Sequence, residues 1–145
     1  MTLIRHLVPL AVLGTLGGCG FSVTPPPQML PPAQVLAAGQ EIRGALERTD
    51  PQADDGSYYD EYELRGAPGT RMTVTLRSSE FDTFLAVGSA PGAGWRQTAG
   101  DDDGAGGTDS RLVLTLPAGG ALVIRANSLE ARRTGAYTLS AQAAP

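Results

Sequence analysis

The sequence predicts an all-β domain, an antiparallel β-sandwich or jelly roll with about eight strands. Three observations favour this fold class. Short apolar runs alternate with polar residues at a period of two, which is typical of half-buried strands. Gly, Pro and Asp separate these runs, and no stretch after residue 39 has the pattern of a long amphipathic helix. The chain has 145 residues, of which 41% are hydrophobic, enough for one domain with a core.

The first two expected strands differ in the strength of their patterns. Within residues 40–46 the strand pattern is weak, because the spacing of Ile42 and Leu46 also allows a helical turn. Within residues 57–64 the alternation is clearer. One face there carries Tyr58, Tyr62 and Leu64, and the other carries Tyr59, Glu61 and Glu63.

The remaining strands follow between turn sequences. The clearest covers residues 71–77, where Met72, Val74 and Leu76 alternate with Arg and Thr. Turns are indicated by Gly-Ala-Pro-Gly at residues 66–69 and by Pro-Ala-Gly-Gly at residues 117–120. The other expected strands are residues 81–87, 94–98, 112–116, 121–126 and 136–141.

The N-terminus predicts a signal peptide over residues 1–18. Arg5 and His6 form a short basic start, and residues 7–16 are an apolar run. This run is too short for a membrane span, which needs about 20 residues. Small residues then lead to Cys19, which is the only cysteine of the chain.

The run Leu16-Gly17-Gly18-Cys19 resembles the lipobox of bacterial lipoproteins. The resemblance implies cleavage before Cys19 and lipidation of that residue, so the chain would contact the membrane through a lipid anchor. By the sorting rule known for enteric lipoproteins, the absence of Asp just after the cysteine implies the bacterial outer membrane. The alternative is a plain secretory signal with an incidental Cys.

A Pro-rich linker is expected over residues 19–37, before a domain at residues 38–145. Prolines crowd into residues 25–32, and they favour extended polyproline II structure. The linker would act as a spacer between the lipid anchor and the domain.

The residue inventory predicts that the chain is not an enzyme. All 11 basic residues are Arg, and after Cys19 there is no His, Lys or Cys. That absence excludes Ser-His-Asp and Cys-His catalysis, a Lys Schiff base and His- or Cys-ligated zinc in the expected domain. Paired carboxylates could hydrolyse a glycoside, but a filled sandwich of this size rarely provides the cleft. The net charge of −4 argues against nucleic acid as a partner.

Several segments, taken in order, resemble the bacterial pre-peptidase C-terminal (PPC) domain over residues 39–142. The resemblance implies a jelly-roll β-sandwich that accompanies exported proteases and other enzymes as a non-catalytic module, some members binding calcium or matrix polymers. Within these 145 residues we expect no catalytic domain beside the module. The matching segments are residues 58–64 with the following Gly-Ala-Pro-Gly-Thr turn, 81–87, 101–104 leading into 109–112, 116–120 and 134–139.

The densest group of chemically active side chains is acidic. Asp101, Asp102, Asp103 and Asp109 lie in one Gly-rich loop, and the family pattern brings Asp82 near it. Ca²⁺ takes six to eight oxygen ligands, which clustered carboxylates can supply, so these five residues are a candidate calcium site. The alternative is a solvated turn in which Asp and Gly serve the turn geometry.

Two further residues could take part in binding or packing. Trp95, between Gly94 and Arg96, is the aromatic residue most expected to be exposed, and it is a candidate ligand-binding residue. Its alternative is packing at an edge of the sandwich. Asp60 shares a face with Tyr58 and Tyr62, where we expect it to pair with an Arg or cap a turn.

Together these observations predict a non-catalytic cell-envelope lipoprotein that carries a PPC-like binding or scaffolding module. Its partner would be an envelope protein or polysaccharide. One alternative is a calcium-dependent carbohydrate- or peptidoglycan-binding module, with Trp95 beside the acidic loop. Another is an accessory subunit or inhibitor of a separately encoded exported protease.

Overall fold

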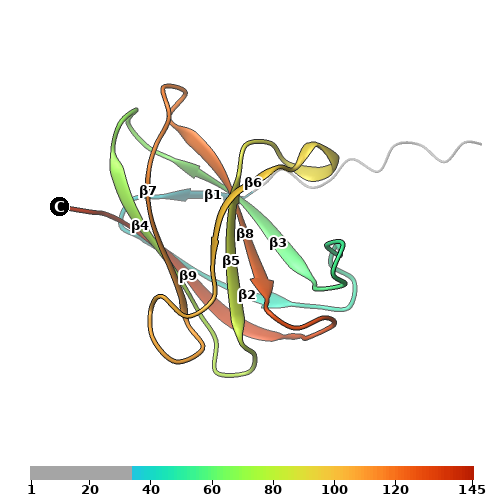
Figure 1. Cartoon of the computed structure of the whole chain (residues 1–145). Helices are drawn as coiled ribbons and strands as arrows, with labels where there is room; N and C mark the ends of the chain where they lie inside the picture. The colour runs from blue at the N-terminus through green and yellow to red at the C-terminus, as the bar shows by residue number, and fades with distance from the viewer. Residues whose placement is uncertain (1–33) are drawn as a thin grey trace, which may run out of the picture.

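A computed structural model describes residues 34–145 of the chain. Over this range the chain forms nine β-strands and one short 3₁₀ helix (Figure 1). The elements are β1 Gln34–Ala37, β2 Gln40–Leu46, β3 Tyr59–Arg65, β4 Arg71–Arg77, β5 Thr83–Gly88, the 3₁₀ helix Gly92–Gly94, β6 Gln97–Asp101, β7 Ser110–Thr115, β8 Ala121–Ser128 and β9 Gly135–Ala143.

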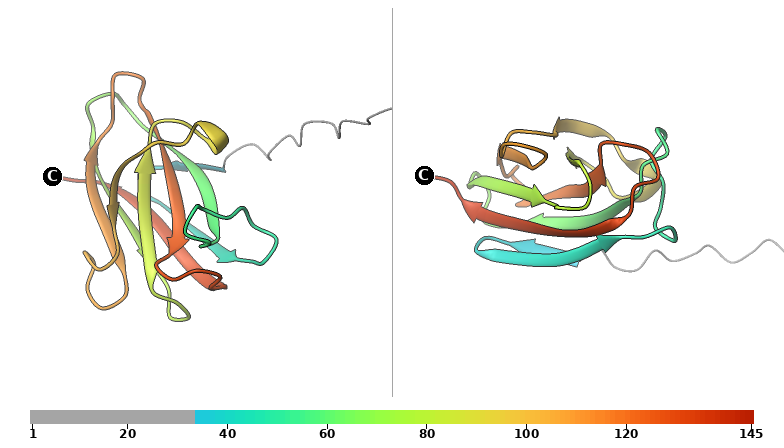
Figure 2. Two further views of the ribbon diagram at one scale, coloured as in Figure 1. Left: turned by 45° about the vertical axis from the view of Figure 1, so that its right-hand side comes forward. Right: turned by 90° about the horizontal axis from the view of Figure 1, so that it is seen from below.

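The strands form two sheets that pack face to face as a β-sandwich, and Figure 2 shows the two layers from below. Sheet A has five strands in the order β1-β3-β8-β5-β6, and sheet B has four in the order β2-β9-β4-β7. All neighbouring strands are antiparallel except β1, which runs parallel to β3. The predicted all-β sandwich is therefore confirmed.

The connectivity of β2 to β9 is that of a jelly roll. The antiparallel pairs are nested: β5 pairs with β6, β4 with β7, β3 with β8, and β2 with β9. Such a nested set of hairpins, wrapped so that alternate pairs fall into opposite sheets, produces two Greek keys. The sheet orders β2-β9-β4-β7 and β3-β8-β5-β6 follow from this wrapping.

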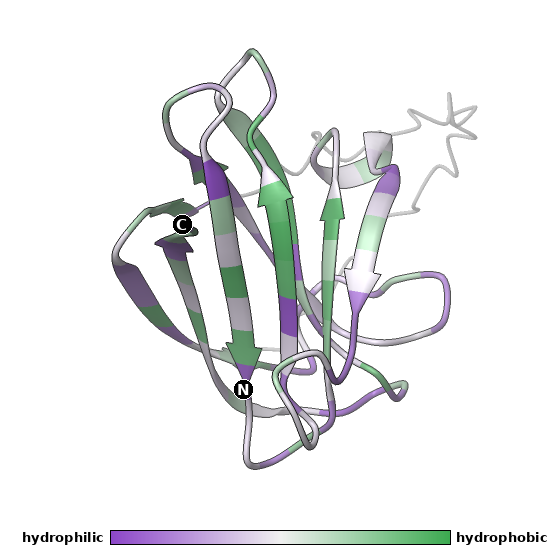
Figure 3. Cartoon of the chain, turned by 60° about the vertical axis from the view of Figure 1, so that its left-hand side comes forward, coloured by the Kyte–Doolittle hydropathy of each residue, from purple (hydrophilic) through white to green (hydrophobic). Residues whose placement is uncertain are grey.

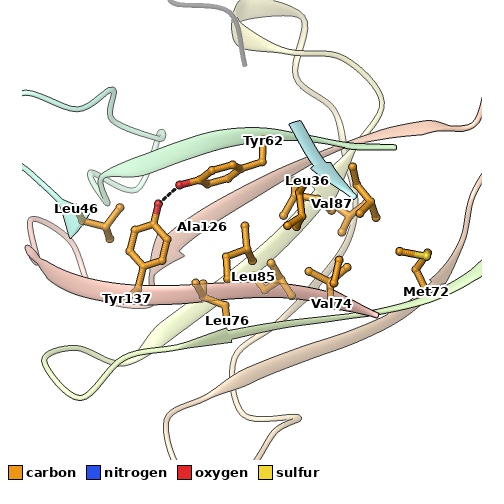
Figure 4. Close-up of a cluster of buried hydrophobic side chains, with 14 of the residues drawn as sticks. Leu36, Leu46, Tyr62, Met72, Val74, Leu76, Leu85, Val87, Ala126 and Tyr137 are labelled. Carbon is orange, nitrogen blue, oxygen red and sulfur yellow. Dashed lines mark hydrogen bonds between the residues drawn. The ribbon is translucent and has the colours of Figure 1, made fainter. Parts of the chain in front are cut away.

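The core lies between the inner faces of the two sheets. Hydrophobic and hydrophilic bands alternate along the strands in Figure 3, as the period of two requires. Leu64, Leu85 and Ile124 point inward from sheet A, and Val74 and Leu139 meet them from sheet B, all with 0% exposure. Figure 4 shows part of this cluster. A filled core of this kind holds the outer faces of both sheets rigid.

The boundary between linker and domain lies earlier than expected. Residues 34–37 form β1, which pairs with residues 62–65 of β3, and Leu36 is fully buried. The expected linker end at residue 37 is therefore wrong, because the burial of Leu36 and pairing with β3 order these residues. The predicted signal peptide, the lipobox with Cys19 and the rest of the linker lie outside the described residues. Within residues 34–145, no helix has the length and apolarity to cross a bilayer.

The segment before β6 also differs from expectation. The sequence predicts a strand at residues 94–98, whereas the structure has a 3₁₀ turn at Gly92–Gly94 and a strand from Gln97. Gly92 has a positive φ of 59°, and its carbonyl accepts a hydrogen bond from the Trp95 amide at 3.1 Å. This turn uses up the residues that the sequence pattern assigns to the strand, so pairing with β5 begins later.

Candidate functional site

The acidic loop joins β6 of sheet A to β7 of sheet B. Carboxylate oxygens of Asp101, Asp102 and Asp103 lie within 4.8 Å of one another. Asp101 Oδ2 also accepts hydrogen bonds from the Gly104 amide at 2.8 Å and the Arg111 amide at 2.7 Å. This carboxylate therefore shapes the turn, as an Asp at a turn commonly does.

The structure brings three of the five predicted calcium ligands together. Asp109 lies apart from them: its Oδ1 accepts the Ser78 amide at 3.3 Å, and its Oδ2 lies 3.4 Å from Arg77 Nε. The backbone next to Asp82 does reach the loop, because the Thr83 amide donates to the Thr108 carbonyl at 3.0 Å. Among the described residues, however, neither the Asp82 nor the Asp109 carboxylate joins the cluster of three. Calcium binding at this loop stays a prediction.

Two buried hydroxyls fasten the acidic loop to the sandwich. Thr83 Oγ1 and Ser110 Oγ are 2.6 Å apart, and both residues are fully buried. Thr83 Oγ1 donates to the Thr108 carbonyl at 2.9 Å, and Ser110 Oγ lies 3.3 Å from the Asp102 carbonyl. The sequence gives little sign of this pair, because small hydroxyl residues are common on both buried and exposed strand faces.

Trp95 lies on the outer face of sheet A, where it stacks on an arginine. The Arg125 guanidinium is 4.1 Å from the centre of the Trp95 ring and 3.8 Å from the centre of the Tyr59 ring. Arg125 is only 6% exposed. The Trp95 ring also covers Gly88, where an added Cβ would lie 2.6 Å from Trp95 Cζ3. Most of this aromatic surface therefore packs against the protein, and a ligand-binding role for Trp95 stays a prediction.

A buried ion pair completes this cluster. Arg125 lies opposite Glu61 in the β3–β8 register, and its Nη2 is 2.7 Å from Glu61 Oε2. The Gly92 amide donates to both Glu61 carboxylate oxygens, at 3.0 and 3.1 Å, and Arg125 Nη2 donates to the Gly92 carbonyl at 3.2 Å. These contacts fasten the loop of residues 89–96 over sheet A. The sequence analysis missed them, although an Arg within the apolar run Ala-Leu-Val-Ile-Arg-Ala is a signal.

Asp60 is a partly buried carboxyl group whose hydrogen-bond partner is a tyrosine of the core. Asp60 Oδ2 accepts a hydrogen bond from the Tyr137 hydroxyl at 2.5 Å, and Tyr137 also hydrogen-bonds the Tyr62 hydroxyl across the two sheets (Figure 4). Burial raises the pKa of the Asp60 carboxyl, and the nearby charges of Asp50 and Glu47 raise it further, although the Tyr137 bond opposes the shift.

Asp60 thus pairs with a tyrosine and not with the Arg or turn that the sequence analysis expects. Burial also raises the pKa of the Tyr62 and Tyr137 hydroxyls, so both stay protonated at neutral pH. Gly44 makes room for the Tyr137 ring, because an added Cβ would lie 2.4 Å from Tyr137 Cζ. The cluster ties sheet A to sheet B, which is a structural role.

The outer face of sheet B is open and carries several arginines. We call the outward-pointing side chains of β2, β9, β4 and β7 the arginine face. Two hollows lie along it, with volumes of about 480 and 370 Å³, and Arg77 lines both. Arg43 and Thr138 line the larger hollow, and Thr75 and Arg111 line the smaller. The sequence patterns gave these residues no binding role.

Comparison with known proteins identifies the fold. No family model matches the chain, and no curated protein does. Among solved structures, the PPC domain of a collagenase from Bacillus anthracis superposes with a TM-score of 0.54 at 14% identity, over 76% of this chain and 94% of that one. PliG of Aeromonas hydrophila, a periplasmic inhibitor of g-type lysozyme, superposes with a TM-score of 0.51 at 18% identity, over 76% and 97%. The predicted resemblance to the PPC domain is thus confirmed in the fold.

Proposed function

We propose that this chain is a non-catalytic binding protein of the bacterial cell envelope, anchored through a lipid on Cys19. The observation that carries the proposal is a contrast within the sandwich. The charged groups Asp60, Glu61 and Arg125 are engaged in contacts within the protein, whereas the arginine face is open to solvent. A surface of that kind suits binding.

The residue inventory and the fold both support a non-catalytic role. Residues 34–145 contain no His, Lys or Cys. The collagenase neighbour is a PPC domain, and the PliG neighbour is an inhibitor of g-type lysozyme. One neighbour is thus a C-terminal domain of an enzyme and the other an inhibitor, and we assign a non-catalytic role to this chain.

The anchor can be tested apart from the domain. Cells that express the chain are labelled with a radioactive fatty acid, and their membranes are then separated. We expect label on the wild-type chain and recovery in the outer membrane, and neither in Cys19→Ser. Equal release of both forms into the periplasm would show a plain secretory signal and would overturn the lipid anchor.

The binding role can be tested with the chain that lacks its anchor. Purified Cys19→Ser chain is mixed with isolated cell envelopes, which are then sedimented. We expect saturable co-sedimentation that excess unlabelled chain competes away, because the sandwich and not the lipid would hold the envelope. A chain that stays in the supernatant at all concentrations would contradict an envelope-binding function.

A second candidate is an inhibitor of an exported hydrolase. The likeness to a periplasmic lysozyme inhibitor favours it. The test is the residual activity of a g-type lysozyme and of secreted proteases titrated with the purified chain. Stoichiometric loss of hydrolase activity would establish that the chain is an inhibitor. Unchanged hydrolase activity at a large excess of the chain would rule out this candidate and leave the binding function.

A further inference from the structure

The cross-strand register gathers arginines on one side of sheet B. Arg43 of β2 lies opposite Thr138 of β9, which in turn lies opposite Arg77 of β4. These residues form one row across three strands. Because neighbouring strands are about 4.8 Å apart, the Cα atoms of the two arginines in this row lie about 10 Å apart. Arg111 of β7 lies opposite Thr75, two residues along β4 from Arg77.

The arginine face is positive although the chain as a whole is acidic. Arg43, Arg71, Arg77 and Arg111 are all exposed on it. The strands contribute one outward acid, Glu41, and the acidic loop borders the face beside Arg111. Within residues 34–145, only one of these four guanidinium groups has a carboxylate within 4.0 Å, namely Arg77 with Asp109 at 3.4 Å. Arg43, Arg71 and Arg111 therefore keep their charge free for a ligand. The Arg77 side chain contacts Asp109 through Nε but is still 58% exposed, so it also remains accessible.

Small polar side chains fill the space between the arginines. Outward hydroxyls come from Thr73, Thr75, Thr138 and Ser140, and Gln142 adds an amide. A guanidinium binds carboxylate, phosphate or sulfate oxygens in a fork, and hydroxyls and amides can both donate to and accept from sugar hydroxyls. The two hollows share Arg77 in their lining, so a ligand that occupies both would cross several strands.

The same face lacks what a protein partner needs most. Protein interfaces draw most of their binding energy from buried aromatic and apolar anchors. Among the described residues, Val113 is the one large exposed apolar side chain on the arginine face, and the tyrosine of β9 points into the core. The composition therefore favours a hydrated, negatively charged polymer over an acidic protein.

We propose that the arginine face binds an acidic polysaccharide, one that carries carboxylate, phosphate or sulfate groups. Arg43, Arg77 and Arg111 bind the anionic groups, and the hydroxyls between them bind the sugar hydroxyls. This inference rests on the proposed function, because it names the ligand class of an envelope-binding module. It differs from the calcium-dependent alternative in both site and chemistry, since no metal takes part.

The test measures binding of polygalacturonate to the purified full chain by calorimetry. Its methyl-esterified form is the neutral control, because the sugar backbone is unchanged. We expect binding to the acidic form alone, weakened by added salt and unaffected by EDTA. The triple variant R43Q/R77Q/R111Q should bind at least about tenfold more weakly. R96Q, which removes an exposed arginine from the sheet A side, should bind like the wild type.

Several binding results would overturn the proposal. Equal binding of the esterified polymer, a requirement for calcium, or an unaffected triple variant would overturn it. Tighter binding of poly-glutamate than of polygalacturonate would identify an acidic protein segment as the partner. If the triple variant unfolds, the single variant R111Q carries the test, with an expected loss of about threefold.

The envelope sedimentation experiment separates this proposal from the proposed function. If Cys19→Ser chain still binds envelopes but binds no acidic polysaccharide, the function stands and the ligand class is wrong. If it binds neither, both fail.

Discussion

The outer faces of the two sheets carry the same kind of side chain in opposite states. On sheet A, the Arg125 guanidinium is enclosed between the Trp95 and Tyr59 rings and paired with Glu61. On sheet B, Arg43 and Arg111 stand exposed among hydroxyl side chains without a carboxylate partner among residues 34–145. One face is closed by its own loop, and the other is open.

The difference shows that the covering loop decides the role of an arginine here. A buried guanidinium is stable only when its charge and donors are matched, and residues 89–96 supply a carbonyl and a ring for that purpose. No comparable loop crosses the arginine face in the described part of the chain (Figure 2). Arginines there stay hydrated and can exchange water for an anionic ligand.

The largest expected effect comes from removing the buried arginine. Arg125→Leu leaves the Glu61 carboxylate beneath the loop without its partner, and we expect a loss of about 3 kcal/mol in the free energy of unfolding. Trp95 is the only tryptophan, so its fluorescence should also shift to longer wavelength. Urea denaturation followed by fluorescence measures both. A loss below about 1 kcal/mol would mean that the pair is not structural.

A smaller effect is expected from uncovering the same arginine. Trp95→Ala removes the ring that stacks on Arg125 and covers Gly88. We expect the free energy of unfolding to fall by about 2 kcal/mol. Amide hydrogen exchange should quicken in residues 89–96 and stay unchanged in β4 and β7. Faster exchange throughout both sheets would show that the loop is not a separate cover.

The acidic loop sits between the two faces and supplies a third test. Asp101→Ala removes the acceptor of two backbone amides, so we expect a loss of about 1–2 kcal/mol. Melting in EDTA and in 10 mM calcium tests the metal hypothesis separately. A site of extracellular affinity would add about 1.5–3 kcal/mol. If the wild-type melting curves in EDTA and in calcium coincide, the calcium hypothesis is wrong. Magnesium at equal ionic strength is the control.

The partly buried Asp60, which is hydrogen-bonded to Tyr137, should make the free energy of unfolding depend on pH. Because burial raises the pKa of Asp60 above its usual 3.8, the folded chain binds this proton more tightly than the unfolded chain does. Its contribution to stability is fully present below pH 3.8 and is lost as the pH rises through the folded pKa. Urea melts of wild type and Asp60→Asn across acidic to neutral pH measure it as a difference. Parallel curves would contradict the assignment.

The smallest expected effect is on the open face. Gln substitutions at Arg43, Arg77 and Arg111 should each change stability by less than about 0.5 kcal/mol, since exposed charges contribute little to folding. Thermal melting of the three single variants beside Arg125→Leu gives the contrast directly. A large loss at any of the three would mean that the arginine face is itself structural.

Much of the fold follows from period-two patterns. The alternation in residues 71–77 correctly identifies the buried side of β4, and the alternation around Tyr62 does so for β3. The jelly-roll order comes through the PPC resemblance, because strand patterns alone do not fix which strands pair. β1 escaped notice, since it is short and follows a run of prolines.

The functional surfaces were harder to foresee, because they depend on register. Glu61, Trp95 and Arg125 meet only when β3 pairs with β8 and the loop before β6 folds back over them. Arg43 and Arg77 belong to one row only because β9 lies between their strands. Taken singly, Arg43, Arg77 and Glu61 look like ordinary exposed strand positions. The Asp cluster was visible because its members adjoin in sequence.

The most direct test of the contrast between the faces is a chemical-shift map of the backbone amides as polygalacturonate is added to the full chain. We predict shifts concentrated in β4, β7 and β9, with the indole N–H of Trp95 unmoved. Shifts centred on residues 89–96 and that indole, with sheet B unchanged, would contradict the account and place the binding surface on sheet A.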